Sequence, residues 1–239
     1  ERTVCEDPPV PCQAYARARR ATLGSPDLVT GLSQHVIDIH REHRFFRGTE
    51  TRRIPIGTSD IVETSPQSNE QAVLYVGQHI EAKGLRTLLE SAEYVNDVIF
   101  HICGTGPDAS RVEDAAERLS NVEYHGFVSD QRLVELRRRV AAAVVPSIWM
   151  EVYGIVIAES FAAGLPVIGS GIGGIPELVT PGETGFLFEP KDSVELAERI
   201  ERLLGDADLR NQMRENALAW AREHTIEAHV DELVEAYEL

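Results

Sequence analysis

Short apolar runs and amphipathic stretches alternate along the chain from residue 72 onward. The apolar runs have the length and continuous hydrophobic character of strands buried on both faces, and the stretches between them have helical spacing. They predict strands at residues 72–77, 98–104, 122–126, 141–147, 166–170 and 185–190, and helices at 85–94, 112–119, 130–139, 155–163 and, briefly, 174–179. This alternation is typical of a parallel sheet with helices on both faces and ligands at the carboxyl ends of the strands. The expected fold class is therefore α/β, with a Rossmann-like sheet.

Both ends of the chain depart from this alternation. The last forty residues, roughly, contain no strand pattern and predict helices at residues 193–204, 209–224 and 227–237, with Asp192 and Asp208 as N-caps. Before residue 72, residues 27–33 and 52–57 have strand character on either side of an expected helix. Residues 58–70, rich in Ser, Thr, Pro and acidic side chains, are the expected linker.

The segment from residue 141 to residue 163 reads as strand, loop and helix, with Gly154 at the point where the loop enters the helix. The free N–H groups of Gly154, Ile155 and Val156 should then point outward, with the positive end of the helix dipole behind them. Such a helix N-terminus suits phosphate or diphosphate. This segment predicts an anion site at the end of a central strand.

Two glutamates, Glu151 and Glu159, bracket this helix start with seven residues between them. Because like charges repel, Glu159 is unsuited to phosphate and better suited to accept hydrogen bonds from ribose hydroxyls. Glu151 lies before the helix and could face the sugar of a bound nucleotide sugar or the molecule that accepts that sugar. The alternative for two isolated glutamates is that Glu151 is a surface charge and Glu159 a solvated helix residue.

The segment PSIWMEVYGIVIAESFAAGLPVIGSGIGGIPELVTPGETGFLFEP, followed by a helix in EPKDSVELAERIERLL, resembles the donor-binding segment of retaining glycosyltransferases of the GT-B fold. Upstream, LYVGQHIEAKG, HICGTGP and VEYHGFVS are similar to the first three strand ends of the same domain. The likeness runs from about residue 72 to the C-terminus. It implies a C-terminal GT-B half, a nucleoside diphosphate-sugar donor and no metal cofactor, with a terminal helix that crosses back to the N-terminal domain.

The resemblance assigns roles to individual residues. Lys83, in the loop after the first strand, is expected to neutralise the diphosphate leaving group, and Glu151 to lie near the transferred sugar. Gln78 stands where the family has an arginine that shares this role, and Gln78 can donate hydrogen bonds but no charge. His79 beside it is a further candidate donor, with surface exposure as the alternative. The expected donor-binding residues are Gly77, Gln78, Gly104, Gly106, Gly126, Phe127, Val128, Tyr153, Gly154, Ile155, Val156 and Glu159.

Several of these glycines and their neighbours have a second interpretation. Gly104 and Gly106 could let a nucleobase approach the backbone or could form a tight structural turn, and the backbone at 126–128 could reach the base edge while Phe127 belongs to the core. Gly104, Gly106 and Ala109 also satisfy the dinucleotide pattern G-x-G-x-x-A, but after the second strand, where that pattern is weak. Glu177, after Gly173 and Gly174, could contact sugar hydroxyls or sit at a helix N-terminus.

A chain of 239 residues has room for one Rossmann-like half and little more. We expect residues 1–71 to be a remnant of the N-terminal acceptor domain with its linker, and residues 72–239 to be the nucleotide-sugar domain. The start at Glu1 in place of Met supports a truncated chain. The acceptor, a saccharide, lipid or small molecule, is then read by a part that is mostly missing.

The formal net charge of −16 argues against nucleic acid or an anionic membrane surface as the main partner. Of 23 basic residues only Lys83 and Lys191 are lysines, which fits salt adaptation, a GC-rich genome or simply solvated helix faces. No apolar run reaches membrane-spanning length and no secretory signal begins the chain, so a cytoplasmic location is expected, with peripheral membrane contact through the missing domain as an option. Cys5 and Cys12 could pair or form part of a metal loop, and Cys103 is expected to be buried.

Three functions follow from these observations. The first is an enzyme that transfers a hexosyl-type sugar from a nucleoside diphosphate to an acceptor, with retention as the resemblance implies. The second is a donor-binding module without turnover, which the expected truncation and Gln78 both favour. The third, an NAD-dependent dehydrogenase, rests on the weak glycine pattern and is disfavoured because the acidic residue downstream, Glu123, lies inside an expected strand.

Overall fold

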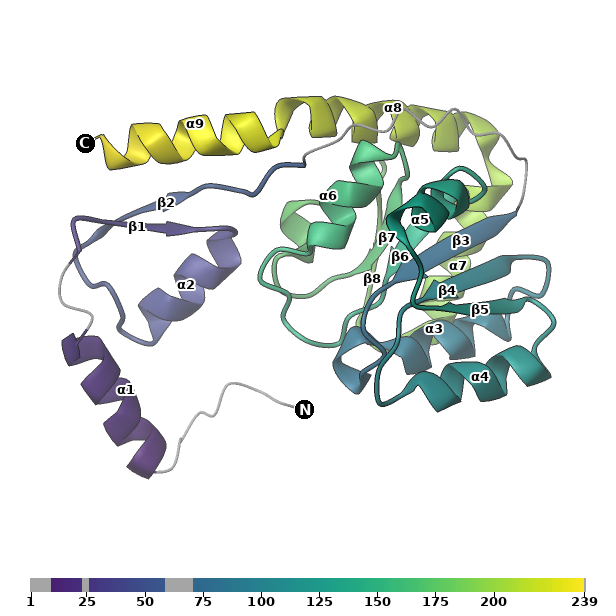
Figure 1. The fold of residues 1–239 in the computed structure, drawn as a ribbon, viewed down its shortest axis with the longest axis horizontal. Coiled ribbons are helices and arrows are strands. Elements are labelled where there is room, and N and C mark those ends of the chain that lie inside the picture. Colours follow the sequence, from purple (N-terminus) through teal and green to yellow (C-terminus); the bar gives the residue numbers. More distant parts are fainter. Residues whose placement is uncertain (1–9, 23–25, 59–70, 239) are drawn as a thin grey trace.

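A computed structural model describes residues 10–22, 26–58 and 71–238 of the chain. It contains a two-stranded sheet near the N-terminus and a six-stranded sheet that carries most of the remaining residues. Figure 1 shows the small sheet set apart from the large one, with the C-terminal helices running over both.

The large sheet is parallel throughout, with the order β5-β4-β3-β6-β7-β8. The strands are β3 Ala72–Val76, β4 Ile99–Cys103, β5 Val122–Gly126, β6 Ala142–Val145, β7 Val167–Ser170 and β8 Gly185–Phe188. The chain builds outward from β3 to β5 and then returns to the other side of β3 with β6, so the order reverses between β3 and β6. Ligands of open α/β sheets bind outside the carboxyl ends of strands at such a reversal.

Helices cover both faces of this sheet, as predicted. Val73 and Tyr75 of β3 point into one core with α3 Leu85–Ala92, α4 Ala109–Arg118 and α7 Ser193–Gly205. Ala72 and Leu74, which alternate with them, point to the opposite side, where α5 Asp130–Arg137 lies. On that side α6 Ile155–Ala162 and α8 Ala207–Glu223 pack together through Phe161 and Ala217. The period of two along β3 thus separates two apolar layers.

The N-terminal residues form α1 Val10–Thr22, then β1 Leu28–Gly31, α2 Gln34–Glu42 and β2 Glu50–Arg53. The two strands are parallel, with Leu28 opposite Glu50, and α2 connects them. The strand, helix and strand agree with the sequence prediction. Helix α1 was not predicted: Cys12, expected to pair with Cys5 or to form part of a metal loop, lies within it, whereas Cys5 falls outside the described residues.

The last helix, α9 Ile226–Tyr237, leaves the large sheet and runs beside β2 (Figure 1). His229 Nδ1 lies 2.9 Å from the carbonyl oxygen of Pro55, and Arg52 is 3.9 Å from Glu235. Thr58, the first residue of the predicted linker, bridges Thr225, and residues 59–70 lie outside the described part. The C-terminus therefore returns to the N-terminal segment, as the resemblance implied.

Two details of the helix termini complete the fold. Asp192 caps α7 by accepting a hydrogen bond from the Glu195 N–H at 2.9 Å, as predicted. The cap of α8 is Asp206 and not Asp208, because α7 ends at Gly205 and the next helix begins immediately at Ala207.

Among the described residues, no helix combines the length and apolar character required to cross a membrane.

Candidate functional site

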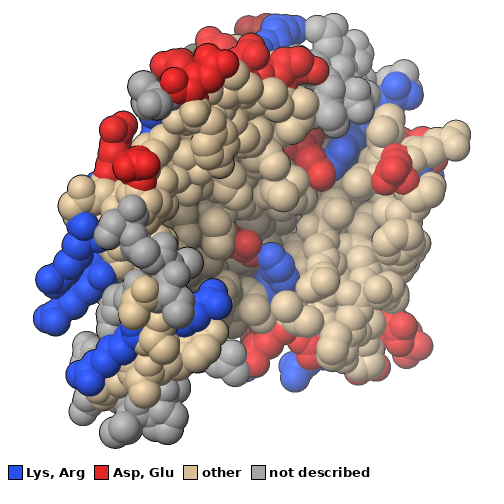
Figure 2. All heavy atoms as spheres, turned by 60° about the vertical axis from the view of Figure 1, so that its left-hand side comes forward, with Lys and Arg blue, Asp and Glu red and all other residues tan. Residues whose placement is uncertain are grey.

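A cavity of about 500 Å³ lies at the carboxyl ends of β3 and β6, where the strand order reverses. Its walls come from the loop after β3, the segment between β6 and α6, and Leu32 of the N-terminal segment. Figure 2 shows a hollow on this side of the molecule, with one acidic and one basic side chain meeting among mostly uncharged residues. The fold thus creates a cleft at the place that its topology predicts.

The N-terminus of α6 forms one wall of the cavity. Gly154 precedes the helix with φ of 91°, a left-handed conformation that favours glycine, and no side chain caps this end. Gly154, Ile155 and Val156 all line the cavity. Their N–H groups belong to the first turn, whose amides have no partner inside a helix, so this wall is suited to an anion.

Lys83 and Glu151 meet directly in the cavity. Lys83 ends a short 3₁₀ turn, η1 Glu81–Lys83, and its Nζ donates to Glu151 Oε1 at 2.5 Å. The hydroxyl of Ser147 donates to the same oxygen at 2.7 Å. The sequence assigned Lys83 to the leaving group and Glu151 to the sugar, and the structure brings the two into one ion pair with Ser147 behind it.

Two tyrosines position the cavity wall. Tyr75 Oη donates to the Gln78 carbonyl oxygen at 2.9 Å, which holds the loop after β3, while the Gln78 residue itself is exposed. Tyr153 Oη donates to the carbonyl oxygen of Ile56 at 2.7 Å, so its hydroxyl contacts the N-terminal segment. Burial, opposed by Arg53, raises the pKa of Tyr153 to about 12. Burial, together with the nearby Glu151, also raises the pKa of Tyr75, so both hydroxyls are protonated donors at neutral pH.

The cavity brings together eight of the fourteen residues predicted for the site. They are Gly77, Gln78, Lys83, Glu151, Tyr153, Gly154, Ile155 and Val156. The other six, Gly104, Gly106, Gly126, Phe127, Val128 and Glu159, are not among its lining residues.

Gly104 and Gly106 pack against the loop that carries Gln78. A Cβ on Gly104 would lie 1.8 Å from the Gly77 carbonyl oxygen, and one on Gly106 would lie 2.4 Å from the carbonyl oxygen of His79. His79 is fully buried beneath this contact, so its expected surface exposure is wrong. Burial lowers the pKa of His79, opposed by the Cys103 backbone and Asp108. The structure gives both glycines a reason in internal packing.

The segment after β5 is exposed in an unexpected way. Phe127 is 84% exposed, so its assignment to the core is wrong, because the chain turns outward at Gly126 with φ of 63°. Val128 is partly buried against the core that contains Leu136. Among residues 126–128, Phe127 is the one that is exposed.

Glu159 lies on α6, on the side that faces α5. Its Oε2 accepts a hydrogen bond from Arg137 at 2.8 Å, and its side chain is 45% exposed. Glu159 is therefore a paired carboxylate, neither a free surface charge nor a lining residue of the cavity.

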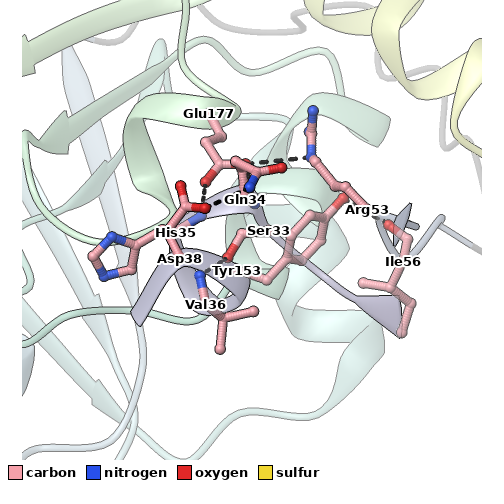
Figure 3. A network of polar contacts seen from close by, with 9 residues as sticks. All are labelled: Ser33, Gln34, His35, Val36, Asp38, Arg53, Ile56, Tyr153 and Glu177. Carbon is pink, nitrogen blue, oxygen red and sulfur yellow. Dashed lines mark hydrogen bonds and ion pairs between the residues drawn. The ribbon is translucent and has the colours of Figure 1, made fainter. Parts of the chain in front are cut away.

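Glu177 connects the large sheet to the N-terminal segment (Figure 3). It ends η2 Ile175–Glu177, and its carboxylate accepts hydrogen bonds from the backbone N–H groups of Gln34 at 2.8 Å and His35 at 2.7 Å. Arg53 Nε lies 3.3 Å from the same carboxylate. The sequence placed Glu177 near sugar hydroxyls or at a helix N-terminus; the helix turns out to be α2, from the other sheet.

Ser147, Trp149 and Met150 are among the lining residues that the sequence did not single out. All three line the cavity between β6 and Glu151, and Ser147 is buried. Their position just after a central strand was the available signal, because ligands gather at strand carboxyl ends.

The family model for "Glycosyl transferases group 1" matches residues 58–220. The chain belongs to this family. Among curated relatives, it is 30% identical over 197 residues to alpha-D-kanosaminyltransferase of Streptomyces kanamyceticus, covering 79% of this chain and 50% of the relative. It is 32% identical to alpha-maltose-1-phosphate synthase of Mycolicibacterium smegmatis, covering 73% and 49%. The chain thus spans about half the length of these glycosyltransferase relatives.

Solved structures of GT-B glycosyltransferases share the fold. Sucrose-phosphate synthase of Thermosynechococcus elongatus superposes with a TM-score of 0.83 at 26% identity, covering 95% of this chain and 61% of that protein. Anabaena HepE, solved in complex with UDP, gives 0.85 at 24% identity, with 95% and 68% covered. The α/β fold is therefore that of the C-terminal part of a GT-B glycosyltransferase.

Proposed function

We propose that this chain supplies the donor side of a glycosyltransferase that moves a hexosyl-type sugar from a nucleoside diphosphate to an acceptor, with retention of anomeric configuration. The observation that carries this proposal is the meeting, in one cavity, of the Lys83–Glu151 pair with the N-terminus of α6. Membership in the group 1 glycosyl transferases supports the reaction class. Retention rests on the family resemblance alone.

In the proposed complex the diphosphate lies at the first turn of α6 and within reach of Lys83, with Gln78 as a neutral donor. Both the helix end and the ammonium stabilise charge as it builds on the leaving group. The bond from the anomeric carbon to the diphosphate oxygen breaks, and that oxygen keeps the electron pair. The acceptor hydroxyl oxygen bonds to the same carbon, and its proton passes to the leaving diphosphate. Glu151 lies beside the transferred sugar, and no bound metal takes part.

The remaining assignments divide along the fold. Glu159, held by Arg137, accepts hydrogen bonds from the ribose, and the exposed backbone after β5 reaches the base. Residues 72–239 form the donor domain, and residues 1–71 belong to the acceptor side and the linker. Leu32 supports this division because it brings the N-terminal segment to the cavity wall.

Calorimetric titration with UDP, GDP, ADP and NAD, at low and at molar salt, tests the proposal. One nucleoside diphosphate should bind saturably, and Lys83→Gln should weaken it about 10- to 100-fold, since a hydrogen bond to a charged group contributes about 1.5–3 kcal/mol. Lys191→Gln is the matched control, because it removes the other lysine of the chain. Equal affinities for the two variants, or binding of NAD in place of a diphosphate, would overturn the assignment.

A donor-binding module without turnover is the second candidate, and Gln78 favours it because a neutral side chain stabilises the leaving group less than an arginine. The two functions differ in one measurement, release of the nucleoside diphosphate from the sugar donor that binds. Slow release in wild type that rises in Gln78→Arg would assign the loss of turnover to this position. Release that is absent in both, with binding intact, would support the module.

A further inference from the structure

Two histidines and a glutamate gather on strands β4 and β5, outside the cavity described above. His101 Nδ1 lies 3.0 Å from His125 Nε2 and 3.2 Å from Glu123 Oε2, and His125 Nε2 lies 3.8 Å from the same carboxylate oxygen. Ligand atoms of all three residues lie close enough together to hold one metal ion, and none of the three residues lines the donor cavity.

The sheet register creates this cluster. His101 and Glu123 are direct partners in the parallel pairing of β4 with β5, and His125 follows Glu123 by two residues. Because strand side chains alternate between faces, Glu123 and His125 point to the same side of the sheet. His101 is fully buried, His125 is mostly buried, and Glu123 is 45% exposed. The cluster is therefore fixed by the backbone from below and open to solvent at the carboxylate.

The three distances fit one metal ion. A triangle with sides of 3.0, 3.2 and 3.8 Å has a circumscribed radius of about 2.0 Å, so a point about 2.0–2.1 Å from all three atoms lies close to their plane. Bond lengths from Zn²⁺ to histidine nitrogen and carboxylate oxygen are about 2.0–2.2 Å. No side chain has to move to meet these lengths.

We propose that His101, Glu123 and His125 bind a zinc-type divalent ion that joins the edge strand β5 to β4. Two imidazoles and one carboxylate suit Zn²⁺ better than Mg²⁺ or Ca²⁺, which prefer oxygen ligands. Three protein ligands leave the fourth position to water on the exposed side of Glu123. The cluster lies on β4 and β5 and shares no residue with the lining of the donor cavity, so we assign the ion a structural role at this edge of the sheet.

The surrounding charges act in both directions. Burial first, then His101, Arg132 and Arg139, lower the pKa of His125, and Glu123 raises it. An imidazole must be neutral to bind a metal ion. The two arginines oppose a cation, so the carboxylate of Glu123 is needed for charge balance as well as coordination. Without an ion, an N–H at His101 Nδ1 can donate a hydrogen bond to His125 Nε2 or to the Glu123 carboxylate. A bound metal ion would replace that proton.

Zinc titration of the chain without a polyhistidine tag tests the site. Calorimetry or competition with a chromophoric chelator should give one tight Zn²⁺ per chain. Glu123→Gln and His125→Gln should each weaken binding by more than about 10-fold, because loss of even an outer-shell partner costs about 10- to 100-fold. The matched control is His43→Gln, which removes an exposed histidine of the N-terminal segment and should leave the affinity unchanged.

Two readouts separate coordination from a general effect on folding. Zn²⁺ should raise the melting temperature of wild type and of His43→Gln but not of His125→Gln, since binding to the folded state alone stabilises it by mass action. Both cluster variants change partly exposed residues, and a wild-type urea-unfolding midpoint in the absence of zinc would show that they fold. Absence of tight zinc binding, or the same affinity in Glu123→Gln and His125→Gln as in wild type, would overturn the proposal.

Discussion

Replacing Glu177 by alanine should loosen the N-terminal segment from the large sheet. Its carboxylate accepts two backbone hydrogen bonds from the first turn of α2 and lies 3.3 Å from Arg53. Figure 3 shows the three contacts converging on one side chain. Because the N–H groups of a first helical turn have no partner within the helix, this carboxylate does for α2 what a capping side chain does.

The cost can be worked out from these contacts. Loss of a cap costs about 0.5–2 kcal/mol, and hydrogen bonds to a charged group contribute about 1.5–3 kcal/mol. The pair with Arg53 is partly exposed and adds about 0–1 kcal/mol. Since all contacts use one carboxylate, they are not additive. We expect the free energy of unfolding to fall by about 2–3 kcal/mol in Glu177→Ala and by about half of that in Glu177→Gln, which keeps one acceptor.

Urea unfolding and amide hydrogen exchange together measure this effect. Exchange should accelerate in α2 and in the pair β1 and β2, and remain slow in β3 and β4, because only the former depend on Glu177. Glu198→Ala, at an exposed position of α7, is the control and should change neither measurement. Wild-type stability and wild-type exchange in Glu177→Ala would refute the reasoning.

Glu177→Ala also distinguishes a residue that holds α2 in place from a residue that contacts the sugar. A residue that binds sugar hydroxyls would weaken binding of the nucleotide sugar and leave the nucleoside diphosphate unaffected. A residue that only holds α2 in place should change the binding of both ligands equally, because its loss alters the position of the whole N-terminal segment. A loss confined to the sugar-bearing ligand, with stability unchanged, would restore the first interpretation of Glu177.

Two substitutions and one labelling experiment test the site and its surroundings. Gln78→Arg should tighten diphosphate binding about 10-fold through a charge-assisted hydrogen bond, and titration showing equal or weaker binding would contradict this. Because the pKa of His79 is lowered in the fold, the unfolded chain binds its proton first, near pH 6.5; stability should therefore fall as pH drops from 7 toward 5, and urea unfolding of His79→Gln should show a smaller fall. Burial raises the pKa of Cys103 to about 11, so peptide mapping after iodoacetamide at pH 8 should find Cys103 unlabelled until the chain is unfolded, and rapid labelling of the folded chain would contradict its burial.

The sheet and its helices were predictable because burial of a strand on both faces requires apolar residues that can be recognised in the local sequence. The four central strands β3, β4, β6 and β7 are short, mostly apolar runs, and the helices between the strands keep their apolar spacing. Helix α1 has no such pattern: its alanine, glutamine and arginine residues favour a helix through intrinsic propensity, and Pro11 lies within its first turn, where proline is tolerated. The prolines before it favoured a loop prediction.

The misassigned side chains depend on contacts between distant segments. His79 follows a strand end, where exposure is the usual expectation, yet the turn at Gly104 closes over it. Phe127 follows strand β5 and is exposed because the chain turns away from the core at Gly126. The contact of His101 with Glu123 requires the register of β4 with β5, which no local pattern specifies.

Lys83 and Glu151 could be predicted as site residues from the sequence, but the ion pair between them could not. The two lie 68 positions apart and meet because β3 and β6 are neighbours that end at the same edge of the sheet. With Glu151 on its ammonium, Lys83 does not present an unopposed positive charge to an arriving diphosphate, and Gln78 adds none. The amides of α6 are then the first contacts that attract the anion, and Lys83 strengthens them only as Glu151 turns from the ammonium toward the sugar. We therefore expect Glu151 to govern the release of the leaving group as well as the position of the sugar.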